Sequence, residues 1–269
     1  MTNRGSREIN GSTAPRGVTV QDMPAQPIAS PRDERPLALI TGVGRAVGIG
    51  AAVAAGLADD GWRVVTCGWR QYDGRMPWGA DAEPLAHYEA DMADPGAPPN
   101  LVARVRAEYG PIRALVIGHC ESTDSAILTT TVESFDRHFA VNARAPWLLI
   151  AAFARQFAGP AGTGRIVAFT SDHVAFNLPY GASKGALDRI VLAAAVELAE
   201  QGITANVINP GATDTGWMSA EVFADVRARN LQPRVGQPAD AAQLVRFVCS
   251  HAGGWINGQL LYSDGGRRG

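Results

Sequence analysis

Short apolar runs alternate with longer amphipathic stretches from about residue 37 onward. The apolar runs predict buried strands at 37–40, 62–67, 115–117, 166–170 and 204–208. The stretches between them have helical spacing and predict helices near 51–60, 98–109, 132–158, 181–201 and 238–250. This alternation predicts an α/β fold, a Rossmann-like, doubly wound parallel sheet of about seven strands with helices on both faces.

The first 35 residues do not share this pattern. Residues 1–35 are rich in Gly, Pro, Ser, Thr and Arg, and they predict a disordered extension. The alternative is an arm that becomes ordered on a partner subunit. Residues 36–269 are predicted to form one domain, because a chain that is 46% apolar and 19% charged can bury a single large core.

Composition argues against several functions. A net charge of −2 gives no reason to expect nucleic acid or an anionic membrane as a partner. Cys67, Cys120 and Cys249 are too scattered for a disulfide framework or a metal site, and their odd number suits a reducing cytoplasm. No apolar run approaches the roughly 20 residues of a membrane span, and we see no secretory signal at the N-terminus.

Four glycines, Gly42, Gly44, Gly48 and Gly50, lie between the first predicted strand and the first predicted helix. Glycines let a pyrophosphate approach the backbone, and the following helix offers free N–H groups at the positive end of its dipole. The spacing is not Gly-x-Gly-x-x-Gly, and an ordinary strand–helix loop is the alternative. The position after the first strand favours nucleotide binding.

A second group of reactive side chains joins the strand at 166–170 to the helix at 181–201. Tyr180 and Lys184 are four residues apart and share one helix face, and Ser171 ends the strand. A cation beside a phenol stabilises the phenolate and moves its pKa, about 10, toward the working range. The group suits reduction of a carbonyl or oxidation of an alcohol, although Tyr-x-x-x-Lys by itself is common by chance.

The chain resembles the short-chain dehydrogenase/reductase family, most closely its 3-oxoacyl-reductase-like branch, in motifs that occur in order: Thr41-Gly42, Gly48-Ile49-Gly50, Asn142, Ser171 and Tyr180-x-x-x-Lys184. The resemblance covers residue 37 to the C-terminus. Further matches are Asp91-Met92, Asn209-Pro210-Gly211, Thr215, Arg234 to Pro238, and Gly258 to Gly266.

The resemblance implies catalytic roles for four residues. Tyr180 would be the acid/base, and Ser171 would hydrogen-bond the substrate oxygen. Lys184 would bind the nicotinamide ribose and lower the Tyr180 pKa. Asn142 would anchor a water for proton relay, and its alternative is a helix-interior residue that bonds a neighbouring backbone group.

The resemblance also implies a dinucleotide cofactor. Asp91 and Met92 would face the adenine, and residues 210–215 would flank the nicotinamide. A helix cap at Asp91 and a plain turn at 210–211 are the alternatives. The residues implied to bind the cofactor are Thr41, Gly42, Gly44, Arg45, Gly48, Ile49, Arg70, Asp91, Met92, Gly118, Tyr180, Lys184, Pro210, Gly211, Thr213 and Thr215.

The end of the second strand favours NADP(H) over NAD(H). It carries no carboxylate before Asp73, whereas Arg70, assisted by Arg45, can pair with a ribose 2′-phosphate. The alternative is that both arginines are exposed surface cations. An unusual insert follows at residues 71–83. We expect a surface excursion there, or else a segment folded over the adenosine end of the cofactor.

Two segments depart from the family pattern. Where the family has Asn-Asn-Ala-Gly, this chain has Ile117-Gly118-His119-Cys120. We expect His119 to replace the lost hydrogen bonds, with substrate contact as its alternative, and Cys120 to be a small packed residue. The link between Ser171 and Tyr180 is shorter than in the family, which predicts a more open substrate mouth.

These observations predict an NADP(H)-dependent oxidoreductase that moves a hydride between the nicotinamide and a carbonyl or secondary alcohol. The alternative is a catalytically silent dinucleotide-binding sensor or assembly protein, suggested by the altered segment after the fourth strand. Residues 216–235 are expected to form a substrate lid in which Trp217 contacts substrate. The resemblance also implies a homodimer or homotetramer formed through the helices at 132–158 and 181–201.

Overall fold

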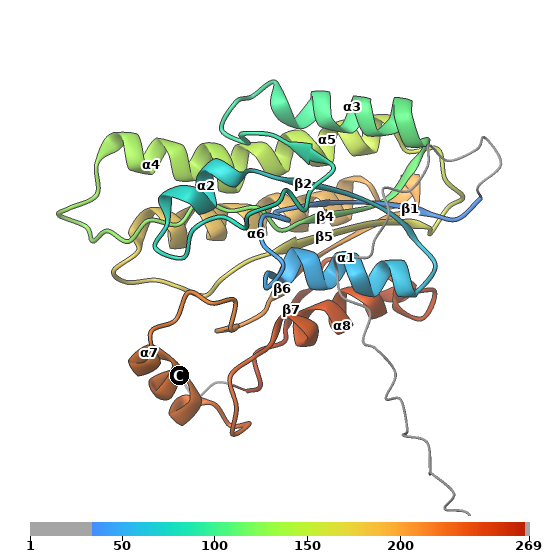
Figure 1. Cartoon of the computed structure of the whole chain (residues 1–269). Coiled ribbons are helices and arrows are strands. Elements are labelled where there is room, and N and C mark those ends of the chain that lie inside the picture. The colour runs from blue at the N-terminus through green and yellow to red at the C-terminus, as the bar shows by residue number, and fades with distance from the viewer. Residues whose placement is uncertain (1–33, 267–269) are drawn as a thin grey trace, which may run out of the picture.

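Seven strands form one parallel sheet in the order β3-β2-β1-β4-β5-β6-β7 in the computed structural model, which describes residues 34–266 (Figure 1). They are β1 (Leu37–Thr41), β2 (Arg63–Gly68), β3 (Tyr88–Glu89), β4 (Ile112–Ile117), β5 (Gly164–Phe169), β6 (Ile203–Asn209) and β7 (Leu260–Tyr262). The order reverses between β1 and β4, and a doubly wound sheet binds its ligand at the carboxyl ends of the strands beside that point. The predicted fold class is confirmed.

Helices cover both faces of the sheet (Figure 1). One face carries α1 (Ile49–Asp59) and α8 (Pro238–Cys249), and the other carries α3 (Ala97–Tyr109), α5 (Ala145–Gln156) and α6 (Leu178–Glu197). The remaining helices are α2 (Arg70–Arg75), α4 (Val132–Phe139) and α7 (Ala220–Arg229), with short turns of π or 3-10 helix at Ala140–Arg144, Ala199–Gln201 and Ala252–Trp255.

Alternate residues of each central strand fill two separate apolar layers. In β1, Leu37 and Leu39 belong to the layer under α3, α5 and α6, whereas Ala38 and Ile40 belong to the layer under α1 and α8. Both faces of the strand are therefore buried, which explains why its sequence is continuously apolar instead of alternating. Gly42 ends the strand with φ +80°, and a Cβ atom there would lie 2.3 Å from the Gly118 backbone, so only glycine allows this approach of β1 to β4.

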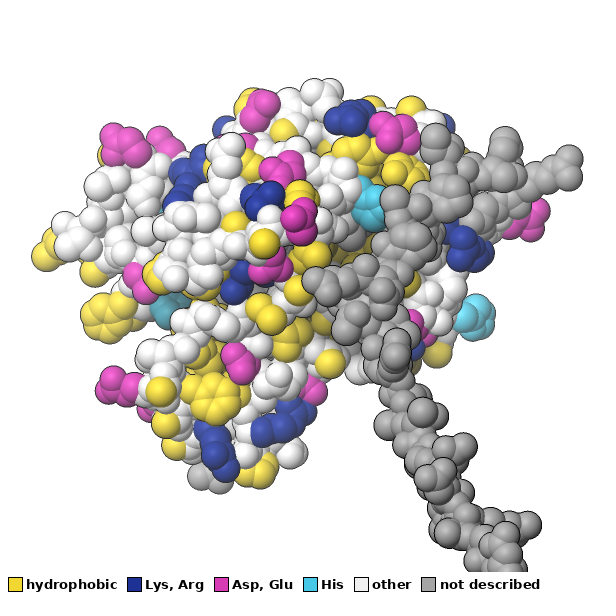
Figure 2. Space-filling view, viewed as in Figure 1, with side chains coloured by type: hydrophobic (Ala, Val, Ile, Leu, Met, Phe, Trp, Pro, Cys, Tyr) yellow, Lys and Arg dark blue, Asp and Glu magenta, His cyan; other side chains and the backbone are white. Residues whose placement is uncertain are grey.

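The predicted elements are present, with boundaries shifted by a few residues. The largest difference lies at 132–158, where one predicted helix is divided into α4, a π-helical turn at Ala140–Arg144, and α5. Residues 1–33 of the predicted extension lie outside the described residues. Within residues 34–266 there is no helix of the length and apolarity that crossing a membrane requires. Acidic and basic side chains are interspersed over the face seen in Figure 2.

Candidate active site and cofactor groove

Three predicted catalytic residues meet at the carboxyl end of β5. Ser171 follows the strand closely, and Tyr180 and Lys184 lie one helical turn apart near the start of α6. The Lys184 Nζ atom is 5.8 Å from the centre of the Tyr180 ring, and the Ser171 side chain hydrogen-bonds the Tyr180 phenol. The structure therefore places the three side chains in one small region.

The pKa of the Tyr180 phenol is shifted in the direction opposite to the expected one. Burial is the main cause that raises the pKa of Tyr180, Cys120 raises it further, and the Ser171 hydrogen bond lowers it only in part. The Lys184 ammonium does not offset this rise, because it donates a 2.8 Å hydrogen bond to the Phe169 carbonyl. Burial also lowers the pKa of Lys184. The prediction of a lowered phenol pKa is therefore wrong for this arrangement of the groove.

Lys184 is the only lysine in the chain, and every other Lys or Arg position is arginine. Its side chain is 3% exposed. An ammonium is a compact charge whose pKa responds to burial, whereas a guanidinium stays charged in every protein environment. The composition itself therefore separates position 184 from all other cations of the protein, a signal that motif reasoning did not use.

Asn142 lies fully buried in the π-helical turn and bonds to backbone groups. Its Oδ1 accepts from the Glu121 N–H at 2.7 Å, and its Nδ2 donates to the Glu121 carbonyl at 2.8 Å and to the Ser183 hydroxyl at 2.9 Å. Both amide hydrogens are thus used to fix the segment after β4 against α6. This is the alternative role considered for Asn142, and its water relay stays a prediction.

His119 joins the carboxyl ends of β1 and β4 to the π-helical turn. Its Nδ1 lies 2.7 Å from the Thr41 hydroxyl and its Nε2 lies 3.1 Å from the Val141 carbonyl. A carbonyl can only accept, so Nε2 carries the proton and Nδ1 accepts from Thr41. Burial is the main cause that lowers the pKa of His119 to about 3, and the ring is neutral at pH 7. Burial raises the pKa of the neighbouring Cys120 thiol, so it is not an activated nucleophile.

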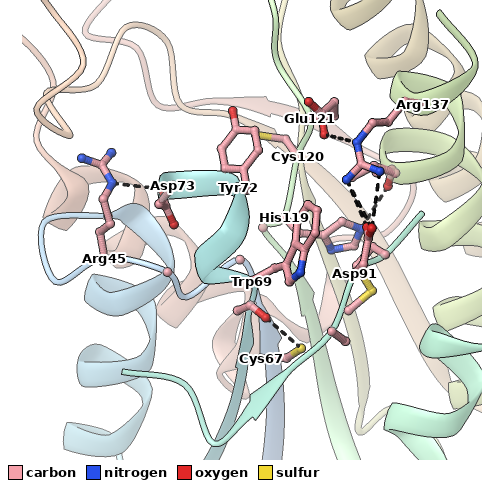
Figure 3. A pocket seen from close by; sticks show the side chains of 18 residues that line it. Arg45, Cys67, Trp69, Tyr72, Asp73, Asp91, His119, Cys120, Glu121 and Arg137 are labelled. Atoms are coloured by element: carbon pink, nitrogen blue, oxygen red, sulfur yellow. Dashed lines mark hydrogen bonds and ion pairs between the residues drawn. The ribbon is translucent and has the colours of Figure 1, made fainter. Parts of the chain in front are cut away.

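A pocket crosses the carboxyl ends of β1, β2 and β4 (Figure 3). Of the predicted cofactor residues, its lining includes Gly42, Gly44, Arg45, Gly48, Asp91, Met92 and Gly118. The lining does not include Thr41, Ile49, Arg70, Tyr180, Lys184, Pro210, Gly211, Thr213 or Thr215. Sequence reasoning missed the lining residues Trp69 and Arg137.

The insert at residues 71–83 is not a surface excursion. It follows β2 through α2 and folds over the pocket, which is the alternative that the sequence left open. Asp73 is buried to 8% exposure, and its Oδ2 would lie only 2.1 Å from a Cβ atom at Gly44. The Tyr72 ring lies beside Cys120 (Figure 3). The Asp73 carboxylate pairs with Arg45 of the glycine-rich turn, and the Tyr72 side chain lines the groove.

Four charged side chains of alternating sign form a chain of ion pairs along the pocket. Arg75 binds Glu121 at 2.5 Å, Glu121 binds Arg137 at 2.9 Å, and Arg137 binds Asp91 at 3.2 Å. The guanidinium carbons of Arg75 and Arg137 lie 5.5 and 4.9 Å from the Trp69 ring. Asp91 also accepts from the Ala93 N–H, so it closes a local turn and does not cap α3.

The segment predicted to flank the nicotinamide folds back on itself after β6. The Thr213 hydroxyl donates to the Pro210 carbonyl at 3.2 Å, and the Trp217 indole donates to the Thr213 carbonyl at 3.0 Å. α7 follows within the predicted lid and stands apart from the sheet (Figure 1). Trp217 is 46% exposed, and its contact with substrate stays a prediction.

The glycine-rich turn has the donors that a phosphate requires. The Ala46 N–H already binds a carboxylate oxygen of Asp81 at 2.7 Å, and Gly44 leaves room for an anion directly against the backbone. A phosphate oxygen is bound by the same kind of backbone donor. The residues present therefore fit the anionic part of a dinucleotide.

A doubly wound sheet with a glycine-rich turn after its first strand, and a Ser, Tyr and Lys group after its fifth, defines the class of dinucleotide-binding dehydrogenases and reductases. Residues 42–268 match the sequence model of a family described as enoyl-(acyl carrier protein) reductase. The chain belongs to the short-chain dehydrogenase/reductase family. Its 3-oxoacyl-reductase-like branch stays a prediction.

Relatives with known names or structures are similar over most of the chain. The uncharacterized oxidoreductase YjdA of Bacillus subtilis is 31% identical over 243 residues, which cover 86% of this chain and 96% of that protein. A short-chain dehydrogenase from Burkholderia cenocepacia, solved in complex with NADP, has a TM-score of 0.74 and 33% identity, and the match covers 86% of this chain and 97% of that one. A blue fluorescent protein from a metagenomic library, solved with NADPH, has a TM-score of 0.74, 28% identity and the same coverage.

Proposed function

We propose that the protein is an NADP(H)-dependent oxidoreductase that moves a hydride between the nicotinamide and a carbonyl or secondary alcohol. The observation that carries this proposal is the meeting of Ser171, Tyr180 and Lys184 beside a turn that binds anionic oxygens. The NADP and NADPH bound to two structural neighbours support the same cofactor for this chain.

The cofactor would lie across the carboxyl ends of the central strands. Gly44 and the Ala46 N–H would hold its pyrophosphate, Arg45 and Arg70 its 2′-phosphate, and Met92 its adenine. When bound, it supplies or accepts the hydride.

The chain's own residues would transfer the proton and stabilise the charge that forms. In reduction, Tyr180 gives its proton to the substrate oxygen while Ser171 donates a hydrogen bond to that oxygen. The positive charge of Lys184 favours the phenolate that remains. This requires the ammonium to turn from the Phe169 carbonyl toward the phenol, because the present hydrogen bond directs it to the strand end.

The test combines cofactor titration with substitution of the phenol. NADPH and NADH are titrated by fluorescence, and a panel of carbonyls and alcohols is then assayed with the preferred cofactor. Tyr180→Phe is expected to lower turnover about 10²–10⁴-fold without changing cofactor affinity. Tyr262→Phe, at a 54% exposed position on β7, is the matched control. Turnover of Tyr180→Phe near that of the wild type would exclude the proposed acid/base.

A catalytically silent dinucleotide-binding protein is the second candidate. It is favoured by one observation, the packing of the insert into the groove that the cofactor would use. Tight NADPH binding without turnover of any compound in the panel would support this candidate over the enzyme.

We also propose a homodimer or homotetramer in the cytoplasm, formed through α4, α5 and α6. Phe135 on α4 is 37% exposed and Trp147 on α5 is 54% exposed, and a groove between these helices and α6 adds apolar surface. Sedimentation equilibrium of the full chain, compared with Trp147→Arg, measures the assembly. A monomeric wild-type protein would contradict it.

A further inference from the structure

We propose that the insert at residues 71–83 is a built-in occupant of the dinucleotide groove, in which two carboxylates take the positions of the cofactor's phosphates and must leave before the cofactor binds. The inference rests on the proposed function, because it takes NADP(H) as the incoming ligand.

Two carboxylates of the insert contact the glycine-rich turn. Asp81 Oδ2 accepts a 2.7 Å hydrogen bond from the Ala46 N–H, and Asp73 Oδ2 lies against the Gly44 backbone. Burial is the main cause that raises the pKa of Asp73, and the charge of Asp81 adds a smaller rise. A pyrophosphate would present two adjacent anionic groups to the same turn.

Two aromatic side chains line the groove on either side of these carboxylates, one toward the adenine position and one toward the catalytic end. The Trp69 ring, which enters the groove just before the insert, lies 4.9 Å from the guanidinium carbon of Arg137, and Arg137 binds Asp91. Asp91 is the residue implied to face the adenine. Tyr72 is half-buried beside Cys120 and lies close enough to the catalytic phenol that Tyr180 contributes to the rise of its pKa. These side chains therefore line the groove from the adenine position toward the catalytic end (Figure 3).

The insert also engages the two cations implied to read the 2′-phosphate. Arg45 Nε lies 3.3 Å from Asp73 Oδ1, and its guanidinium carbon lies 4.9 Å from the Trp78 ring. Arg70 donates from Nη2 to the Asp81 and Ala82 carbonyls at 2.9 and 3.0 Å. Departure of the insert therefore frees the anion-binding turn and both arginines in the same movement. The 2′-phosphate of NADP(H) can then pair with these arginines, whereas the 2′-hydroxyl of NAD(H) cannot form such ion pairs.

The contacts that hold the insert are mostly polar, and its outer side is open. Gly79 has φ +71°, and a Cβ atom at Gly74 or Gly79 would meet no atom within 4 Å. A segment held mainly by hydrogen bonds, ion pairs and cation–π contacts opens locally at a lower free-energy cost than an element of the core. If only molecules with an open insert bind the cofactor, the apparent Kd equals the intrinsic Kd divided by the open fraction. Weakening the contacts that hold the insert closed raises this fraction and therefore tightens cofactor binding.

The test uses the full chain with Asp73→Asn and Asp81→Asn combined. The double variant is expected to bind NADPH about tenfold more tightly than the wild type, because two charge-assisted contacts of the closed state are removed. Glu83→Gln is the control, since it removes one carboxylate charge at an exposed position of the same insert. A second variant replaces residues 71–83 by a short Gly-Ser link, in case the double variant does not fold. Binding is followed by the fluorescence of the bound NADPH. Opening is followed by hydrogen exchange of peptides covering 43–50 and, in the variants that keep the insert, 71–83.

The outcomes separate this inference from the proposed function. NADPH is expected to slow exchange at 43–50 and to speed it at 71–83 in the wild type. Without cofactor, exchange at 43–50 is expected to be faster in the double variant than in Glu83→Gln. Equal exchange at 43–50 in these two variants overturns the inference, whether or not NADPH binds. Failure of every form to bind NADPH is a separate result, and it would refute the proposed function. Equal NADPH affinity in all variants, with unchanged exchange at 71–83, overturns the inference while leaving the proposed function intact.

Discussion

The two ends of the groove are built in opposite ways. At the catalytic end, Ser171 follows β5, and Tyr180 and Lys184 lie on α6, the next element of the chain, so the three residues meet through one short link. At the adenosine end, the pocket is enclosed by side chains from α2, from the loops after β3 and β4, and from α4, which are joined by a chain of ion pairs.

Catalysis and ligand binding therefore depend on different kinds of contact in this protein. Local spacing positions the reacting groups, because one helical turn is enough to set Tyr180 above Lys184. Long-range pairing shapes the binding end, because Arg75 and Glu121 are far apart in the chain and meet only in the folded protein. Substitutions at the catalytic end should therefore change turnover with little effect on folding, and substitutions at the adenosine end should do the reverse.

The single lysine gives the largest expected effect. Lys184→Met should lower turnover about 10³-fold, because the phenolate loses its cation. Its free energy of unfolding should not fall, because the buried ammonium has one hydrogen bond among the described residues, to the Phe169 carbonyl, and burial disfavours its charge. Turnover assays and urea unfolding at pH 7.5 measure both quantities. A large loss of stability would place Lys184 among the structural groups and weaken the comparison.

Glu121→Gln should show the opposite pattern. The Glu121 carboxylate is 4% exposed and pairs with both Arg75 and Arg137, so its loss leaves two guanidinium groups without their shared partner. We expect the free energy of unfolding to fall by about 2–4 kcal/mol, with turnover at saturating substrate and cofactor within a factor of about three. Asp225→Asn breaks an exposed pair with Arg229 and should cost less than about 1 kcal/mol. Equal costs for the two variants would show that burial of the pair does not matter.

The sequence predicted the parts of this protein that depend on local pattern. The buried strands, the glycine-rich turn and the catalytic group all follow from residue types at short spacing. The path of the insert did not follow, because its polar composition suits a solvated loop, and the partners of Asp73 and Asp81 lie in a turn some 30 residues earlier. Asn142 shows the same limit. Its hydrogen bonds to the Glu121 backbone depend on a π-helical turn, which hydrophobic periodicity cannot predict.

His119 lies where the two ends meet, and it should make the protein sensitive to acid. Its pKa is lowered to about 3 by burial, whereas an unfolded histidine titrates near 6.5, so the unfolded state binds the extra proton between these values. Stability should therefore fall as pH falls below about 6.5, by about 1–2 kcal/mol at pH 5.

Urea unfolding at pH 7.5 and pH 5 measures this effect in the wild type, His119→Gln and His251→Gln. Glutamine does not titrate, so His119→Gln should lose less stability on acidification although it starts from a lower value. His251 is exposed and its replacement should leave the pH dependence unchanged. The same dependence in all three proteins would contradict a neutral, buried His119.

The smallest expected effect concerns Arg70, which is proposed to bind the 2′-phosphate and also holds the insert by hydrogen bonds. Arg70→Ala should reduce the preference for NADPH over NADH about tenfold, because a charge-assisted contact to the 2′-phosphate is lost. The same substitution removes the bonds from Arg70 to the Asp81 and Ala82 carbonyls, so NADH should bind somewhat more tightly than it does to the wild type. Fluorescence titration with both cofactors gives the ratio and the absolute affinities, and Arg229→Ala serves as the surface control. If both affinities rise and their ratio stays constant, Arg70 only holds the insert closed, and the choice of NADPH lies with other residues such as Arg45.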